Sequence, residues 1–166
     1  MQRRKLLTLA ALPLLVPQPA RAIEVPAGPV VLSLSGRIRQ TNRGAEALFD
    51  MAMLQRLPQT SFSTQTPWYS QPRKFTGPLL HELLAAVGGK GSQLRAMALN
   101  DYRVEIPVED LRRHDVLLAC LLDDKPMSVR DKGPLFIIYP FDQDATLRNA
   151  LYYSRCAWQL KAIEVL

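Results

Sequence analysis

Residues 125–140 read KPMSVRDKGPLFIIYP and join a charged turn to an apolar run. Three consecutive charged residues, 130–132, stand directly before Gly133-Pro134, and the apolar residues 135–139 end at Pro140. A short apolar run between turn residues is typical of a strand that is buried on both faces. The glycine permits close approach of the backbone to a ligand. The adjacent Arg130 and Asp131 can present hydrogen-bond donors and an acceptor to a polar ligand. A solvated turn is the alternative interpretation of the charges.

On both sides of this stretch, apolar and alternating runs predict strands separated by brief helices. Strands are expected at residues 30–35, 59–66, 94–99, 102–106, 116–122, 135–139 and 158–165. Helices are expected at 45–56 and 78–87, with a turn or short helix at 108–111 and a helical turn or extended chain at 149–154. The Asn100-Asp101 pair lies between two strand patterns and indicates a β-hairpin. Together these patterns predict one mixed α+β domain with two or three helices, in which strands predominate.

The first 22 residues have the composition of an export signal. Basic residues 3–5 precede the largely apolar stretch 6–16, and residues 20–22 (ARA) have the small-x-small pattern of a cleavage site. A helix over this stretch, at about 1.5 Å per residue, is too short to cross a hydrocarbon core of about 30 Å. We therefore expect a periplasmic protein that does not span the membrane. The Arg3-Arg4 pair also fits a twin-arginine signal, so the general and the twin-arginine export routes both stay open.

Removal of this signal changes the charge balance. The chain has 21 Lys and Arg against 15 Asp and Glu, and the signal holds four of the basic residues and none of the acidic ones. Residues 23–166 therefore carry a net charge of +2, which gives no reason to expect nucleic acid or an anionic membrane as a partner. These 144 residues are enough for a single core and too few for two ordinary domains.

Common signatures of catalytic chemistry are missing from the sequence. His81 and His114 have no second histidine at ligand spacing, and no nucleophile elbow, phosphate loop or dinucleotide fingerprint occurs. Cys120 and Cys156 lie inside apolar segments without metal-ligand spacing. An exported chain permits one disulfide between them, but buried free thiols are the favoured interpretation.

Several segments, taken in this order, resemble the molybdopterin-binding domain of the sulfite-oxidase fold. The sequence FTGPLLHELL at 75–84 is similar to the Gly-x-Pro-Leu-x-x-Leu-Leu helix start of that fold. The other matching segments are 99–102 (LNDY), 106–110 (IPVED), 117–119 (LLA), 125–135 (KPMSVRDKGPL), 138–140 (IYP) and 154–160 (SRCAWQL). The resemblance spans roughly residues 62–165 and implies a single mixed-sheet, barrel-like domain over residues 23–166.

One departure from this family concerns the metal. In its enzymes, a cysteine on the strand before the Gly-x-Pro-Leu helix supplies a thiolate to molybdenum, and the corresponding residues 61–68 (SFSTQTPW) contain none. Hydroxyl and amide groups are poor replacements for a soft thiolate. The resemblance therefore implies a non-catalytic pterin-binding protein, similar to short periplasmic members of which some are sensors. Those sensors contact the periplasmic part of a membrane signalling protein that controls cyclic-di-GMP. A molybdopterin-dependent oxidoreductase and a structural or assembly factor with an empty pocket are the alternatives.

For a pterin, the resemblance implies a site of seven residues. The ligand is flat, so Trp68 can stack on it. Asp101 or Asp131 can accept hydrogen bonds from its amino-pyrimidinone edge, while Arg130 or Arg155 donates to its oxygen. The full candidate set is Trp68, Asp101, Tyr102, Arg130, Asp131, Tyr139 and Arg155. A buried ion pair with Asp131 is the alternative role of Arg155, and Trp158, which alternates with Leu160, is expected in the core.

Overall fold

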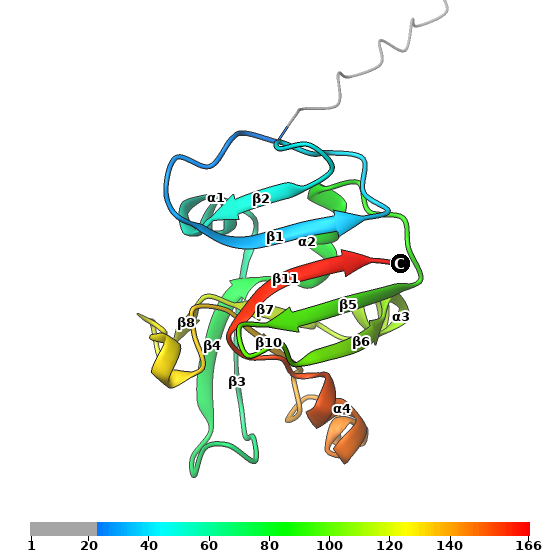
Figure 1. Ribbon diagram of the computed structural model, residues 1–166. Helices are drawn as coiled ribbons and strands as arrows, with labels where there is room; N and C mark the ends of the chain where they lie inside the picture. Colours follow the sequence, from blue (N-terminus) through cyan, green and yellow to red (C-terminus); the bar gives the residue numbers. More distant parts are fainter. Residues whose placement is uncertain (1–22) are drawn as a thin grey trace, which may run out of the picture.

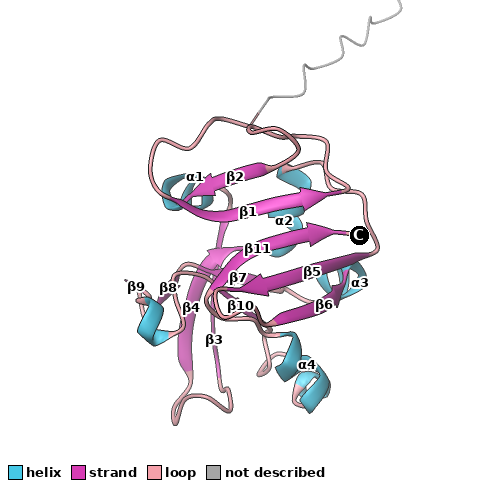
Figure 2. Cartoon of the chain, in the orientation of Figure 1, coloured by secondary structure: helices cyan, strands magenta, loops and turns pink. Residues whose placement is uncertain are grey.

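The computed structural model describes residues 23–166, and the expected export signal at residues 1–22 lies outside this part. The described chain is an α+β domain in which short helices pack against β-sheets (Figures 1 and 2). Within residues 23–166, no helix combines the length and the apolar character needed to cross a bilayer.

A five-stranded mixed sheet forms one side of the molecule (Figure 1). Its strands lie in the order β2 (Ala47–Asp50), β1 (Val30–Gly36), β11 (Leu160–Val165), β5 (Gln93–Ala98) and β6 (Arg103–Pro107). β1 runs parallel to β11, and the other neighbouring pairs are antiparallel. The sheet therefore joins the beginning of the described chain to its end. β5 and β6 form the expected hairpin, and Asp101 has a left-handed φ of 63° in its turn.

Two smaller antiparallel sheets complete the β structure. One has the order β3 (Gln59–Thr64), β4 (Arg73–Pro78), β8 (Leu121–Leu122) and β9 (Lys125–Pro126), and the other pairs β10 (Phe136–Ile138) with β7 (Leu117–Ala119). The strand expected at 116–122 is thus interrupted at Cys120, and its two parts join different sheets. None of the three sheets of the described chain closes into a barrel, so the barrel-like part of the expectation is not met.

Four α-helices occur in residues 23–166, where two or three were expected. They are α1 (Met51–Arg56), α2 (Leu80–Ala86), α3 (Val108–Arg113) and α4 (Ala150–Arg155), and two 3₁₀ turns, η1 (Val129–Asp131) and η2 (Ala145–Leu147), lie in the loops. In Figure 1, α1, α2 and α3 lie behind the five-stranded sheet, and α4 lies below it beside β6. The helix expected at 45–56 is half wrong, because residues 47–50 form β2 and only residues 51–56 are helical.

One buried core includes residues of all three sheets. In β1, Leu32 and Leu34 are buried while Ser33 and Ser35 are partly exposed, which is the period of two expected of a strand with one covered face. β7 and β10 are buried along their whole length, as the apolar run 135–139 predicts. β4 passes so close to β7 at Gly77 that a Cβ there would overlap the carbonyl oxygen of Leu118, so this packing requires glycine.

Candidate functional site

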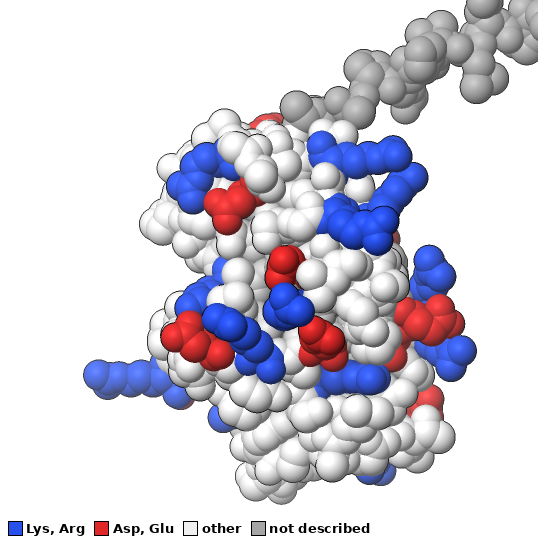
Figure 3. Space-filling model, turned by 45° about the vertical axis from the view of Figure 1, so that its right-hand side comes forward, with Lys and Arg blue, Asp and Glu red and all other residues white. Residues whose placement is uncertain are grey.

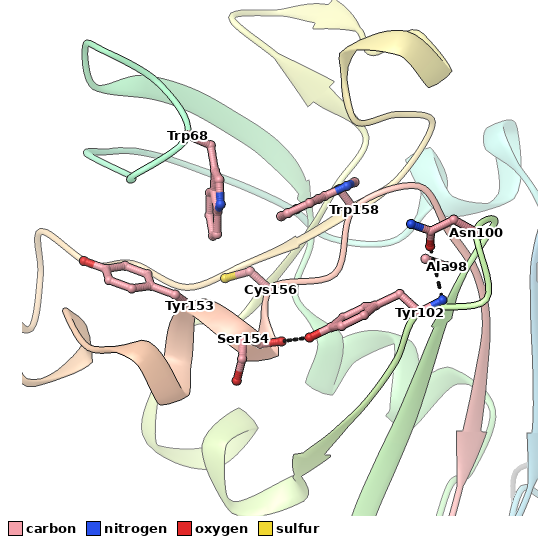
Figure 4. A pocket seen from close by; sticks show the side chains of 8 residues that line it. All are labelled: Trp68, Ala98, Asn100, Tyr102, Tyr153, Ser154, Cys156 and Trp158. Carbon is pink, nitrogen blue, oxygen red and sulfur yellow. Dashed lines mark hydrogen bonds between the residues drawn. The ribbon is translucent and has the colours of Figure 1, made fainter.

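A pocket of about 260 Å³ lies between the β3–β4 loop, the β5–β6 turn and α4. Figure 4 shows its four aromatic side chains, Trp68, Tyr102, Tyr153 and Trp158, around the side chain of Cys156. The remaining lining residues are Ala98, Asn100 and Ser154. Its walls are therefore mainly aromatic, with a few polar groups from the turn and the helix, which is the usual composition of a small-molecule site.

Trp68 is held by other aromatic rings. It belongs to the β3–β4 loop, which has a proline near each end. Its ring centroid lies 5.4 Å from that of Trp158, with the two planes at 69°, and it also contacts Phe136 at 5.7 Å and Tyr153 at 6.0 Å. Tilted and edge-to-face pairs of this kind are favourable. The two tryptophans therefore form a corner, in which a flat ligand can stack on one ring and meet the edge of the other.

The opposite wall is fixed by hydrogen bonds. Asn149 caps α4 because its side chain accepts from the backbone N–H of Leu151 at 2.9 Å. The hydroxyl of Tyr102, at the end of the β5–β6 turn, donates to the backbone carbonyl of Ser154 at 2.8 Å (Figure 4). This bond ties the turn to α4, so the positions of Tyr102 and Tyr153 depend on each other.

Two polar groups of the pocket differ in what they can offer a ligand. The Asn100 side-chain oxygen accepts from the backbone N–H of Tyr102 at 3.1 Å, and its NH₂ group has no partner among the described residues. Asn100 can therefore donate to a carbonyl oxygen of a ligand. Burial raises the pKa of the Cys156 thiol well above its ordinary value, so this sulfur stays protonated at neutral pH. Both cysteines are buried and free, as expected.

Of the seven candidate residues, Trp68 and Tyr102 lie together in this pocket. Arg130 and Asp131 line a neighbouring pocket of about 300 Å³ beside η1. Asp101 lies in neither pocket: its side chain is 73% exposed and pairs with Lys161 at 2.8 Å. Asp101 is therefore a hairpin-turn residue, and the structure does not place it where it could accept from a ring held by Trp68.

Tyr139 and Arg155 do not line the pocket. They belong to a buried cluster of polar side chains. The Tyr139 hydroxyl donates to Oδ2 of Asp110 at 2.7 Å, and Nη1 of Arg155 donates to the same oxygen at 2.7 Å. Tyr139 is fully buried, so it cannot touch a ligand without rearrangement of the core. The alternative role of Arg155, a buried ion pair with Asp131, is wrong in its partner, because the carboxylate that Arg155 contacts is that of Asp110 in α3.

Sequence patterns missed most of the pocket. Trp158 was expected in the core because it alternates with Leu160, but β11 begins only at Leu160 and Gln159 has a left-handed φ of 52°. This break in the strand leaves Trp158 half-buried at the pocket wall. Tyr153 lies in a segment whose pattern was ambiguous between helix and extended chain. The aromatic pair Tyr152-Tyr153 was the only local signal for it.

The residues of the pocket do not fit a molybdenum cofactor. Residues 61–68 offer hydroxyl and amide groups in place of the family's thiolate, and the thiol in the pocket, Cys156, belongs to a different segment, directly after α4. No group of three or more His, Cys, Asp or Glu side chains in residues 23–166 is arranged to hold a metal ion. The aromatic walls instead suit a flat organic ring, which needs no soft metal ligand.

The charged side chains are distributed unevenly over the surface. On the face drawn in Figure 3, Lys and Arg are interspersed with Asp and Glu across the middle of the molecule. The lowest part of that view, at the height of α4 in Figure 1, carries few charges.

Comparison with known proteins gives no family for this chain. No family model matches it, and no curated protein shows a significant match.

Proposed function

We propose that this protein is an exported, non-catalytic pterin-binding protein with the fold of the sulfite-oxidase molybdopterin-binding domain. It acts as a periplasmic sensor that reports pterin occupancy to a membrane signalling partner controlling cyclic-di-GMP. The observation that carries the proposal is the aromatic pocket, in which Trp68 of the β3–β4 loop meets Trp158 at 5.4 Å.

The size and chemistry of the pocket support a small flat ligand. Its volume of about 260 Å³ lies below the roughly 300–1,000 Å³ usual for drug-sized ligands. A bicyclic ring can stack on one tryptophan while its edge faces the polar side of the pocket, where Asn100 offers a donor. No carboxylate lines this pocket, so the N–H groups of a pterin would bond to neutral oxygens, such as those of Ser154 and Tyr102.

The sensor part of the proposal is supported by exposed apolar side chains beside the pocket. Leu99 and Tyr102, on either side of the β5–β6 turn, are 47% and 44% exposed, and Leu151 of α4 is 54% exposed. A contiguous apolar patch formed by such side chains is the kind of surface that soluble proteins use for contact with a partner. A partner that covers them would lie over the same turn and helix that carry Asn100, Tyr102 and Tyr153, so ligand occupancy could alter its affinity.

We predict that Trp68→Ala weakens binding of pterin at least tenfold, because the variant loses the stacking face. Trp68→Phe keeps a flat ring and should retain most of the affinity. Pterin titration followed by ligand fluorescence measures both. Thermal unfolding of each variant checks that the domain still folds.

Tyr152→Ala is the matched control, since Tyr152 is a half-buried aromatic residue of α4 that does not line the pocket. Its pterin affinity should stay close to that of the unmodified protein. If Tyr152→Ala and Trp68→Ala lost affinity equally, the cause would be a general destabilisation of the domain and not the loss of the Trp68 ring. An unchanged affinity in Trp68→Ala would remove this pocket as the pterin site.

A further inference from the structure

A groove of about 460 Å³ lies between α2 and α3, and none of its lining residues lines the aromatic pocket. Its apolar lining consists of Leu84 and Ala85 of α2 and Val108 and Leu111 of α3. Val108 and Leu111 are buried, Leu84 is half-buried and Ala85 is exposed. An apolar side chain that entered the groove would therefore contact core residues at its floor.

The loop after β1 packs against the end of α2, beside this groove. The N–H of Arg39 donates to the carbonyl of Val87 at 2.9 Å. The N–H of Lys90 donates to the carbonyl of Arg37 at 2.9 Å. Gly88, between the two contacts, has a left-handed φ of 59°, and a Cβ there would lie 3.2 Å from Cβ of Arg39. Lys90 lines the groove, so these contacts hold the backbone of Arg37 and Arg39 next to it.

Three cations at this place have no acidic partner. Arg37, Arg39 and Lys90 are exposed, and none of them forms an ion pair with a carboxylate within residues 23–166. In Figure 3, Lys and Arg side chains gather at the upper right, at the height of the end of β1 in Figure 1. This part of the surface therefore attracts negatively charged groups.

Two further basic side chains, His81 and Arg112, line the groove itself, and each has an acidic neighbour on its own helix. His81 Nε2 lies 3.3 Å from Glu82 Oε1, and Arg112 Nη1 lies 3.7 Å from Glu109 Oε2. Neither glutamate lines the groove, and no other carboxylate of the described chain does. The groove thus combines an apolar floor with basic groups around it.

This combination selects a class of partner. The apolar floor suits apolar side chains and the unpaired cations favour carboxylates, so a protein segment that carries both is complementary to the groove. An anionic bilayer fits less well, because recognition of acidic lipids generally takes a cluster of about four to eight Lys or Arg side chains. A flat bilayer surface also does not reach the floor of a groove between two helices.

We propose that the groove between α2 and α3 binds an acidic segment of a partner protein. Apolar side chains of that segment enter the groove, and its carboxylates pair with Arg37, Arg39 and Lys90. The site goes beyond the proposed function, because it shares no lining residue with the aromatic pocket and binds its partner with or without pterin.

The test uses arrays of short synthetic peptides as probes. In one array Glu and Asp alternate with Leu, Phe or Ser, and in a matched array Gln and Asn replace the acidic residues. The labelled protein should bind acidic peptides that also carry Leu or Phe, and should bind neither their amide counterparts nor acidic peptides with Ser alone. The strongest peptide is then measured in solution by fluorescence anisotropy. Its affinity should fall as the ionic strength rises, because salt screens exposed charges.

Two sets of variants locate the site. Arg39→Gln combined with Lys90→Gln should weaken binding of this peptide about fivefold, since each exposed charge pair contributes modestly. Ala85→Glu places a carboxylate in the groove at an exposed position, and should weaken binding more than Ala85→Gln, which has the same size without the charge. Lys125→Gln removes an exposed lysine outside the groove and should leave the affinity unchanged. All of these variants should bind pterin as the unmodified protein does.

The inference is overturned if no acidic peptide binds, if the amide peptides bind equally well, or if the affinity survives both sets of variants. Sedimentation with vesicles of phosphatidylcholine and phosphatidylglycerol, without peptide binding and lost when Arg39 and Lys90 are neutralised, would assign the surface to a membrane instead. A dimer that dissociates in Ala85→Glu, measured by analytical ultracentrifugation, would show that a second copy covers the groove and would also contradict the inference. Pterin binding is measured separately on the same protein, so failure of this site leaves the proposed function standing.

Discussion

Asp110 shows how a single carboxylate can organise the core below the pocket. One of its oxygens, Oδ2, accepts from the Tyr139 hydroxyl and from the Arg155 guanidinium, both at 2.7 Å. The three residues come from α3, from the loop after β10 and from the end of α4. The side chains of Arg155 and Asp110 are 15% and 10% exposed, so their charges are screened little by water. Arg155 also lies over the Tyr152 ring at 5.3 Å.

We predict that Asp110→Ala lowers the free energy of unfolding by about 3 kcal/mol, because it leaves the Arg155 charge and the Tyr139 hydroxyl buried without an acceptor. Urea unfolding at neutral pH measures this loss. Tyr139→Phe removes one hydrogen bond and should cost about 1 kcal/mol. Asp115→Ala, at an exposed position without an ion pair in the described chain, is the control. Equal stability of Asp110→Ala and Asp115→Ala would contradict the role of the cluster.

At the scale of residues, the sequence predicted which side chains can bind a ligand better than it predicted which side chains contact each other. Trp68 stands in a proline-flanked polar loop, where an aromatic ring has little reason to be buried, and the structure places it in a pocket wall. For Arg155, the sequence left open a ligand contact and a buried ion pair with Asp131. Its true partner, Asp110, is 45 residues away in the sequence, and no local pattern reports which distant elements meet.

At the scale of elements, residues 45–56 explain one error in the expected fold. The apolar residues 47–49 are consecutive, and such a run fits a buried strand as well as a buried part of a helix. Only Asp50 marks where the helix begins. The Asp50 side chain accepts from the N–H of Met53 at 2.8 Å, as an N-cap does. Its other oxygen accepts from Ala27 and Gly28, so one carboxylate joins the helix start to the segment before β1.

This carboxylate should make stability depend on pH. The N–H groups of Gly28, Met53 and Ala27 favour its ionised form and hold the pKa of Asp50 below its ordinary value of 3.8. A lowered pKa in the folded state adds stability that is present above the ordinary value and is lost as the pH falls through the lowered one. We predict that the melting temperature falls less between pH 7 and pH values below 3.8 in Asp50→Asn than in the unmodified protein. Parallel pH dependences would contradict this role.

Elements bounded by glycine or proline were predicted best. The 78–87 helix and the 94–106 hairpin lie close to their expected positions as α2 and β5–β6. Glycine and proline act locally, through the φ angle or a missing backbone N–H, so their effect can be predicted without knowledge of the tertiary structure. The strand at 116–122 had no such signal at Cys120. Its division between two sheets follows from packing alone.

At the scale of the whole molecule, the pocket is a product of topology. Its aromatic residues come from the β3–β4 loop, the β5–β6 turn, α4 and the segment before β11, which span residues 68 to 158. The sequence showed the α+β class and one member of the aromatic corner. It could not show that these four segments converge, because convergence depends on the order of strands in the sheets. For the same reason, the position of the Lys132 ammonium group over the rings of Tyr69 and Trp158 was visible only in the fold.

The most direct test of the central claim is to measure which small molecules remain bound to the protein after purification from its own host. Acid releases bound small molecules, which are then assayed together for pterin fluorescence and for molybdenum. We predict pterin at close to one per chain and no stoichiometric molybdenum, with the pterin fraction greatly reduced in Trp68→Ala. Molybdenum at close to one per chain would contradict the account, which rests on the absence of a cysteine from residues 61–68, where the family supplies its thiolate. A protein that contains neither and fails to bind added reduced pterins would contradict it as well.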